Sequence, residues 1–116
     1  MVDLGKFESQ VFKGTIKEVR EISLREYLEQ RHGAKAEKVI AQFNQENIDR
    51  PHVVLIISHE NAEIDWFGMV PKAQGWNKSN LKKVLDRNGL PGDTKKWVGK
   101  EIELKVNSQG FLRVAV

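Results

Sequence analysis

A lysine-rich segment that also carries two tryptophans is the part of this sequence best suited to binding chemistry. Between Lys72 and Lys100 the chain has eight Lys and Arg residues against two Asp, and Trp76 and Trp97 lie within the same segment. Single-stranded nucleic acid is bound by cations along the phosphates and by aromatic rings on which bases stack. Trp76 follows Gly75 in a predicted loop, where an exposed ring would suit stacking, although it could instead plug one end of the fold.

Candidate binding residues also lie outside this segment. Lys13 and Lys17 alternate along the first predicted strand and would share one face, which in small β-barrels often lines the binding groove. Arg20 follows a shift in that alternation and falls either on the rim of the core side or on the outer face. The candidate nucleic-acid site joins cations and aromatic rings from several elements: Lys13, Lys17, Arg20, Phe67, Lys72, Trp76, Lys78, Lys82, Lys83, Arg87, Lys95, Lys96 and Arg113.

Several of these residues also have an ordinary structural explanation. Lys82, Lys83 and Arg87 lie on a predicted amphipathic helix, so they are typical of a solvated helix face. Phe67 is exposed only if Trp66 points into the core, and the two aromatic residues exchange roles if their strand pairs in the other register. The fold therefore decides which members of the candidate site lie together.

No catalytic site is predicted. His32, His52 and His59 lack the spacing of a zinc-binding motif, and the chain has no cysteine. His59 lies near Glu63 and Asp65, but a polar hairpin tip explains this group better than a cation site does. The sequence has neither a Gly-rich phosphate loop nor a recognisable pair of nucleophile and base. We expect a non-catalytic protein that uses no metal or cofactor.

Composition and charge indicate a globular protein with an anionic partner. The 116 residues are 40% hydrophobic and 30% charged, with a net charge of +3. Residues 1–70 carry 9 Lys and Arg against 12 Asp and Glu, whereas residues 71–116 carry 10 against 4. No apolar run approaches the roughly 20 residues of a membrane span. "MVDLGKFESQ" lacks the layout of a signal peptide, so we expect a cytoplasmic protein, in the host cell if it is viral.

The first half of the chain predicts one long strand and a helical region. In residues 10–22, Phe12, Gly14 and Ile16 alternate, but Val19 falls out of phase, which indicates a β-bulge or a sharp bend. The stretch "SLREYLEQRHGAKAEKVIAQFNQEN" opens with a capping box and carries two apolar stripes. Because Gly33 separates the stripes, we expect one interrupted helix or two short helices.

The second half predicts two hairpins on either side of another helix. The run "HVVLIIS" is typical of a strand that is buried on both faces, with the preceding helices over its outer face. "EIDWFGMV" is the returning strand. Asn77 or Ser79 caps the next helix, which ends near Gly89. "KEIELKV" and "FLRVAV" form a terminal hairpin around the turn "NSQG".

Two architectures fit this order of elements. The first is a mainly β fold with helices (α+β), an OB-fold-like five-stranded barrel with a helical insertion, residues 23–47, between strands one and two. The second is a ferredoxin-like α/β sandwich with an extra C-terminal strand, in which the first helical region is an integral crossover. The phase shift in the first strand and the tight terminal hairpin favour the OB-like barrel, as a single domain over residues 1–116.

Three stretches of the C-terminal half form a recognisable pattern: "NKSNLKKVLDRNG", "GDTKKWVGKEIELKV" and "GFLRVAV". With the helix start Asn77-Lys78-Ser79-Asn80 and the strand entry Trp97-Val98-Gly99-Lys100, this pattern resembles a family of small phage and prophage proteins over about 40 of the 116 residues. The pair Lys95-Lys96 departs from the family, which commonly has acidic residues there, and the helical insertion has no counterpart. The resemblance implies an OB-like fold and a single-stranded-DNA-binding or replication accessory role.

Together these features predict non-catalytic binding of single-stranded DNA, with RNA open to the same chemistry, in phage or mobile-element replication. The mechanism would be electrostatic attraction plus base stacking, with little sequence preference. The alternative is a protein–protein interaction module or a dimerising structural protein on the same barrel. In that case the apolar stripes of "LREYLEQRHGAKAEKVIAQF" would dock a replication protein or a second copy. No membrane partner is expected.

Overall fold

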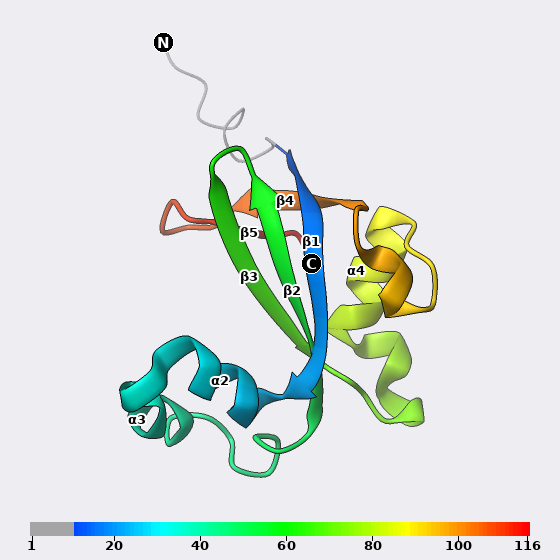
Figure 1. Ribbon diagram of the computed structural model, residues 1–116. Coiled ribbons are helices and arrows are strands. Elements are labelled where there is room, and N and C mark those ends of the chain that lie inside the picture. Colours follow the sequence, from blue (N-terminus) through cyan, green and yellow to red (C-terminus); the bar gives the residue numbers. More distant parts are fainter. Residues whose placement is uncertain (1–10) are drawn as a thin grey trace.

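The computed structural model describes residues 11–116 and shows a five-stranded antiparallel sheet that curls into a nearly closed barrel (Figure 1). The strand order is β3-β2-β1-β4-β5. This is the predicted OB-like α+β fold. In the ferredoxin-like alternative a third strand would separate the first two, but here β1 pairs directly with β2. The strands are β1 (Phe12–Ser23), β2 (Pro51–His59), β3 (Ala62–Met69), β4 (Glu101–Val106) and β5 (Leu112–Val114).

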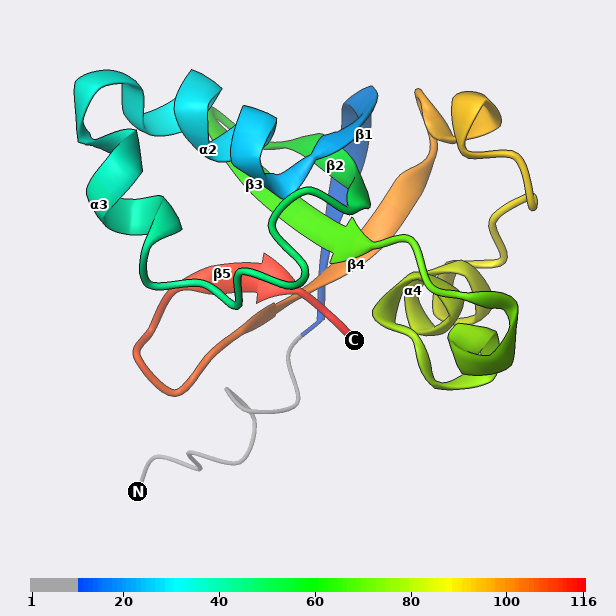
Figure 2. The same cartoon turned by 90° about the horizontal axis from the view of Figure 1, so that it is seen from below.

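The helices form two groups on opposite sides of the barrel (Figures 1 and 2). The first group is the predicted insertion between β1 and β2, with α2 (Leu24–His32), the 3₁₀ turn η1 (Gly33–Lys35) and α3 (Ala36–Ile40). The second lies between β3 and β4, with η2 (Ala73–Lys78), α4 (Asn80–Asn88) and η3 (Thr94–Trp97). Among the helices of the described residues, none is long and apolar enough to cross a membrane.

The long strand β1 is bent by the predicted bulge. Its register with β2 shifts between Ile16 and Glu18, so Lys17 is the extra residue. Residues before the bulge pair with β4, beginning with Phe12 opposite Leu104, and residues after it pair only with β2. β1 therefore joins the two halves of the barrel. The predicted start of this strand at residue 10 lies outside the described residues.

The main core fills the barrel and is closed by α4. Alternate side chains of the strands point inward, as the sequence alternation predicts, and α4 adds Leu81 and Val84. Trp97, only 1% exposed, lies at the centre of this core, where its indole N–H donates to the carbonyl of Pro91 at 2.7 Å. Trp66 packs half-buried against the same core, on the side that its phase predicts.

A second core lies on the outer face of β2, under the helical insertion. Val54 of β2 is fully buried against Leu24, Leu28 and Ile40. Both faces of β2 are thus covered, as its continuous apolar run predicts. The apolar stripes of the insertion are used in packing it onto the sheet.

Local signals set the ends of the helices. Ser23 caps α2 by accepting from the N–H of Glu26 at 3.1 Å, and Ser79, one of the two predicted caps, begins α4 by accepting from the N–H of Lys82 at 3.2 Å. Gly33 and Gly89 end α2 and α4 with positive φ, as predicted. The final strand is shorter than the predicted residues 111–116. The side chain of Asn107 accepts from two backbone N–H groups, which extends the turn.

Candidate nucleic-acid interface

Two neighbouring cavities flank η2 and bring part of the predicted site together. We call them the cationic cavity, of about 470 Å³, and the apolar cavity, of about 550 Å³. The cationic cavity is lined by Arg50, Lys72 and Lys78, whereas Trp76 lines the apolar cavity. Pro71 lines both, so the two cavities meet at this residue.

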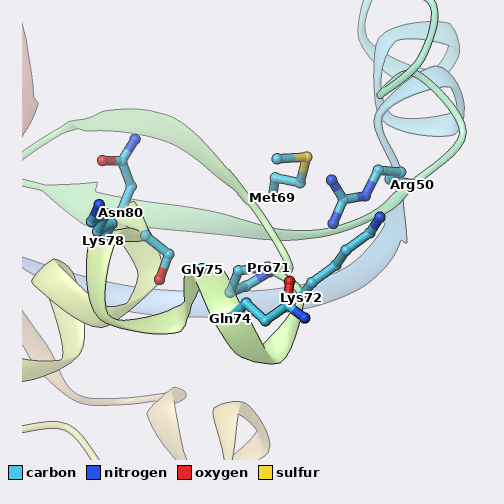
Figure 3. A pocket seen from close by; sticks show the side chains of 9 residues that line it. Arg50, Met69, Pro71, Lys72, Gln74, Gly75, Lys78 and Asn80 are labelled. Atoms are coloured by element: carbon cyan, nitrogen blue, oxygen red, sulfur yellow. The ribbon is translucent and has the colours of Figure 1, made fainter.

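The cationic cavity holds its charged groups at two ends. Arg50 and Lys72 lie at one end and Lys78 with Asn80 at the other, with Met69 between them (Figure 3). No Asp or Glu is among its lining residues. Such a concavity has a positive potential that attracts anions.

The apolar cavity presents a partly exposed indole. Trp76 is 37% exposed, and the ring shares the cavity with Val53, Leu85 and the core residue Trp97. Thr94 of η3 also lines this cavity, and its Oγ1 donates to the carboxylate of Glu21, another lining residue, at 2.5 Å. Trp76 thus lines a cavity, whereas Trp97 is buried in the core, as predicted. Stacking by Trp76 stays a prediction.

Local hydrogen bonds fix the position of η2. The N–H of Gly75 donates to the carbonyl of Lys72 at 2.9 Å, which forms the first 3₁₀ turn. Ser79 ends the segment, because its N–H and its hydroxyl both donate to the carbonyl of Trp76, at 3.1 and 2.7 Å. Since the same hydroxyl caps α4, the Trp76 backbone is held against the start of a core helix.

The predicted cations of β1 are engaged with carboxylates and lie away from the cationic cavity. Lys13 pairs with Glu103 at 3.8 Å and Lys17 with Glu63 at 3.6 Å. Arg20 contacts Glu18 at 2.7 Å and donates to the side-chain carbonyl of Gln30, which places it on the outer face beside the insertion. The structure therefore does not join this part of the predicted site to η2.

The cations of α4 and η3 divide into paired and unpaired groups. Lys82 contacts Asp86 at 2.7 Å, and Arg87 contacts Glu103 at 2.5 Å. Within residues 11–116, no carboxylate forms an ion pair with Lys83, Lys95 or Lys96. Lys95 and Lys96 lie on η3, between Thr94 and Trp97, which both line the apolar cavity.

Phe67 and Arg113 lie at a third cavity, on the side of the barrel that carries the insertion. Phe67 is 36% exposed and packs against Tyr27 and Phe43, with ring centroids 5.4 and 6.4 Å apart. Its predicted position on the face opposite Trp66 is confirmed. Arg113 lines the same cavity, and its guanidinium lies 5.6 Å from the ring centroid of Phe111. These two residues are separate from the cavities at η2.

Two polar clusters tie the helices to the sheet. Arg87 donates a hydrogen bond to Glu103 and lowers the pKa of that carboxyl below its usual value, with a further contribution from the charge of Lys13. On the insertion, the hydroxyl of Tyr27 donates to Asp65 at 3.1 Å, and Arg31 pairs with the same carboxylate. Burial, followed by the charge of Asp65, raises the pKa of Tyr27 above its usual value.

These contacts also account for the polar residues near the β2–β3 turn. Glu63 pairs with Lys17, and Asp65 with Arg31. The ring of His59 shares a hydrogen bond of 2.8 Å with the carbonyl of Lys13. Among the described residues, no three His, Asp or Glu side chains are arranged to hold a metal ion.

Arg50 is the one cation lining the cationic cavity that the sequence patterns do not indicate. It lies in the acidic half of the chain, just before Pro51, and shares no spacing with Lys72 or Lys78. Its guanidinium donates to the carbonyl of Val70 at 3.1 Å. The only signal is the pairing of the two adjacent strands, because a hairpin brings the residue before β2 next to the residues after β3.

Comparison with family models, with curated proteins and with solved structures finds no match to this chain. Its function is therefore inferred from its own residues.

Proposed function

We propose that this chain binds single-stranded nucleic acid, with DNA as the expected form, across the surface of η2. The observation that carries the proposal is the meeting of two cavities of different chemistry at Pro71. A strand that crosses η2 would place phosphates against Arg50, Lys72 and Lys78, and a base against Trp76. Binding of this kind depends on phosphate charge and on base π-faces, so it has little sequence preference.

The charge of the cationic cavity supports this proposal, because no carboxylate lines it, whereas Glu21 and Asp93 line the apolar cavity. Lys83, Lys95 and Lys96, on the neighbouring elements α4 and η3, have no ion-pair partner among residues 11–116. OB-like barrels hold single strands in grooves of this chemistry, with cations along the backbone path and aromatic rings under the bases. The resemblance to phage proteins and the replication role stay predictions, since no comparison bears on them.

The alternative, a protein–protein interaction module, is less well supported, because the apolar stripes on which it was based are packed within the chain. The apolar side chains of the insertion that would dock a partner, such as Leu24, Leu28 and Ile40, are buried against β2. Their stripes are explained by packing within the chain.

Trp76→Ala tests the proposal directly. We expect it to weaken binding of a labelled single strand of about 30 nucleotides by about 1–3 kcal/mol, the contribution of one stacked base. Most of the quenching of protein fluorescence on binding should disappear with it, because Trp97 is buried and Trp66 is half-buried. The measurement is fluorescence anisotropy together with tryptophan emission, at about 50 mM salt.

Phe111→Ala is the matched control, since Phe111 is an exposed aromatic residue on the terminal hairpin, outside both cavities. Its affinity should equal that of the wild type. Absence of binding by the wild-type protein at low salt would overturn the proposal. Equal losses in the two variants would remove Trp76 from the site.

A further inference from the structure

The cationic cavity contains more positive charge than an internal phosphodiester requires. Three cationic side chains line one concavity of about 470 Å³: Arg50, Lys72 and Lys78. No carboxylate lines it. Within residues 11–116, none of the three has an ion-pair partner, in contrast to the paired cations of β1. The cavity is therefore electrostatically complementary to an anion of more than one charge.

Arg50 is held in place before any ligand arrives. Its Nη2 donates to the carbonyl of Val70. Its backbone N–H donates to the carbonyl of Asn47 at 3.1 Å, and its own carbonyl shares a hydrogen bond of 2.8 Å with the ring of the buried His52. The N–H of Val70 in turn donates to the carbonyl of Pro51 at 2.9 Å. The guanidinium has five N–H donors, and its other donors remain for a ligand. A fixed arginine fork suits a phosphate group with several free oxygens.

The rest of the cavity lining is uncharged. Met69 and Pro71 contribute apolar surface between the two charged ends (Figure 3). Uncharged side chains with hydrogen-bond donors, Gln74 and Asn80, also line the cavity.

We propose that the cationic cavity receives the terminal phosphomonoester of a nucleic-acid strand. A phosphomonoester carries a charge near −2 and three free oxygens, whereas a diester within the strand carries one charge. Pro71 joins this cavity to the apolar cavity, so a strand whose end lies here would have its first base beside Trp76. This inference rests on the proposed function, since it assigns the end of the strand that crosses η2.

The test compares three oligonucleotides of one sequence, about six nucleotides long, with an internal fluorophore: one with a 5′-phosphate, one with a 3′-phosphate and one with neither. We expect one of the phosphorylated strands to bind about tenfold more tightly than the unphosphorylated strand. The end that gives the preference identifies the polarity of the bound strand. Equal binding of all three would overturn this inference and leave the proposed function standing, whereas no binding of any strand would overturn both.

Variants show whether the preference comes from this cavity. Arg50→Gln should abolish the preference for a terminal phosphate, because it should weaken binding of the phosphorylated strand more than binding of the unphosphorylated strand. Arg25→Gln, at an exposed arginine that pairs with Asp49 on the insertion, is the matched control and should keep the preference. If Arg50→Gln does not fold, Lys72→Gln provides the same test, because Lys72 has no ion-pair partner among residues 11–116. A preference that survives in both cavity variants would overturn the inference.

Discussion

Gly14 leaves room for side chains from both strands that neighbour β1. A Cβ atom added at this position would lie 2.6 Å from Cγ2 of Ile57 and 2.9 Å from Cδ1 of Leu104. These two side chains come from β2 and β4, the two neighbours of β1. Because Gly14 has no side chain, Ile57 and Leu104 can both pack against the same position of β1.

Gly14→Ala should destabilise the protein by about 1–3 kcal/mol, the usual cost of overpacking a core. The loss of chain entropy in the unfolded state acts in the opposite direction and is smaller, about 0.4–1 kcal/mol. Urea unfolding followed by circular dichroism measures the difference. The control is Gly92→Ala, where an added Cβ meets nothing within 4 Å, and its stability should be unchanged or slightly raised. Equal midpoints for Gly14→Ala and the wild type would contradict the packing argument.

Residue types identified part of the candidate site. The presence of Trp76 among lysines was evident from the sequence, and the structure places Lys72 and Lys78 in one cavity. The predicted loop around Trp76 was wrong, because this segment forms the 3₁₀ helix η2. The ion pairs were not evident. Lys13 meets Glu103 only because β1 pairs with β4, and a partner so distant in the chain has no local signature. Arg50 was not predicted as a site residue for the same reason, because only the pairing of β2 with β3 brings it near Lys72.

At the scale of elements, β4 and α4 are joined through Glu103. Its carboxylate contacts Arg87 of α4 and Lys13 of β1, and its backbone N–H donates to the side chain of Asn88 at 2.8 Å. One residue thus connects the helix that closes the barrel to the two strands beneath it. The pKa of this carboxyl is lowered by the hydrogen bond from Arg87.

The stabilising effect of the Glu103 carboxylate should depend on pH. Because its pKa is lower in the folded protein than in the unfolded chain, the contribution is complete above the unfolded pKa, about 4.3, and is lost as pH falls through the folded value. At pH 7, Glu103→Gln should lower the free energy of unfolding by about 0.5–1 kcal/mol, because the pair is near the surface. The gap should narrow at acid pH, as the pH falls below the unfolded value and through the lower folded one.

Urea unfolding of wild type and variant at both pH values measures this gap. Glu101→Gln is the control on the same strand, since Glu101 forms no ion pair within the described part of the chain. It should show no gap that depends on pH. A Glu103→Gln gap of the same size at low and neutral pH would mean that the charge of Glu103 contributes nothing.

The elements themselves were largely predictable, because their signals are local. The out-of-phase position of Val19 indicated the bulge, Ser23 marked the start of α2, and the start of α4 was narrowed to Asn77 or Ser79. The sequence could not decide between these two residues, because either side chain can cap a helix, and it did not show that Asn107 lengthens the last turn. Phe67 lies on the predicted face of β3. Its contacts with Tyr27 and Phe43 could not be predicted, because they depend on how the insertion packs against the sheet.

Across the whole molecule, paired and unpaired cations lie in different places. Those of β1 are engaged with carboxylates, whereas Lys72, Lys78, Lys95 and Lys96 have no ion-pair partner among residues 11–116. The net charge of only +3 therefore does not reveal the positive charge that gathers at the cationic cavity. Counterions condensed on nucleic acid are released by cations that reach the phosphates, so the placement of cations matters more than their number.

The salt dependence of binding should reveal this difference. Replacing both Lys72 and Lys78 by Ala should reduce the slope of log K against log salt by about 1.4, at about 0.7 for each lost phosphate contact on a single strand. The double variant Lys13→Ala and Lys17→Ala removes the same charge from β1 and should change the slope much less. Anisotropy titrations at several salt concentrations give both slopes. Equal reductions would indicate a diffuse electrostatic field without a defined site.

The central place of β1 has a consequence for the order in which a newly made chain can fold. Emerging from the ribosome, β1, the insertion, β2 and β3 are complete long before β4, yet the first residues of β1 pair with β4. The insertion and the first hairpin can form early, while the inner face of the sheet waits for α4 and β4 to cover it. Contacts between such distant residues form slowly, so the apolar inner face of the sheet stays accessible to solvent until the last third of the chain is synthesised.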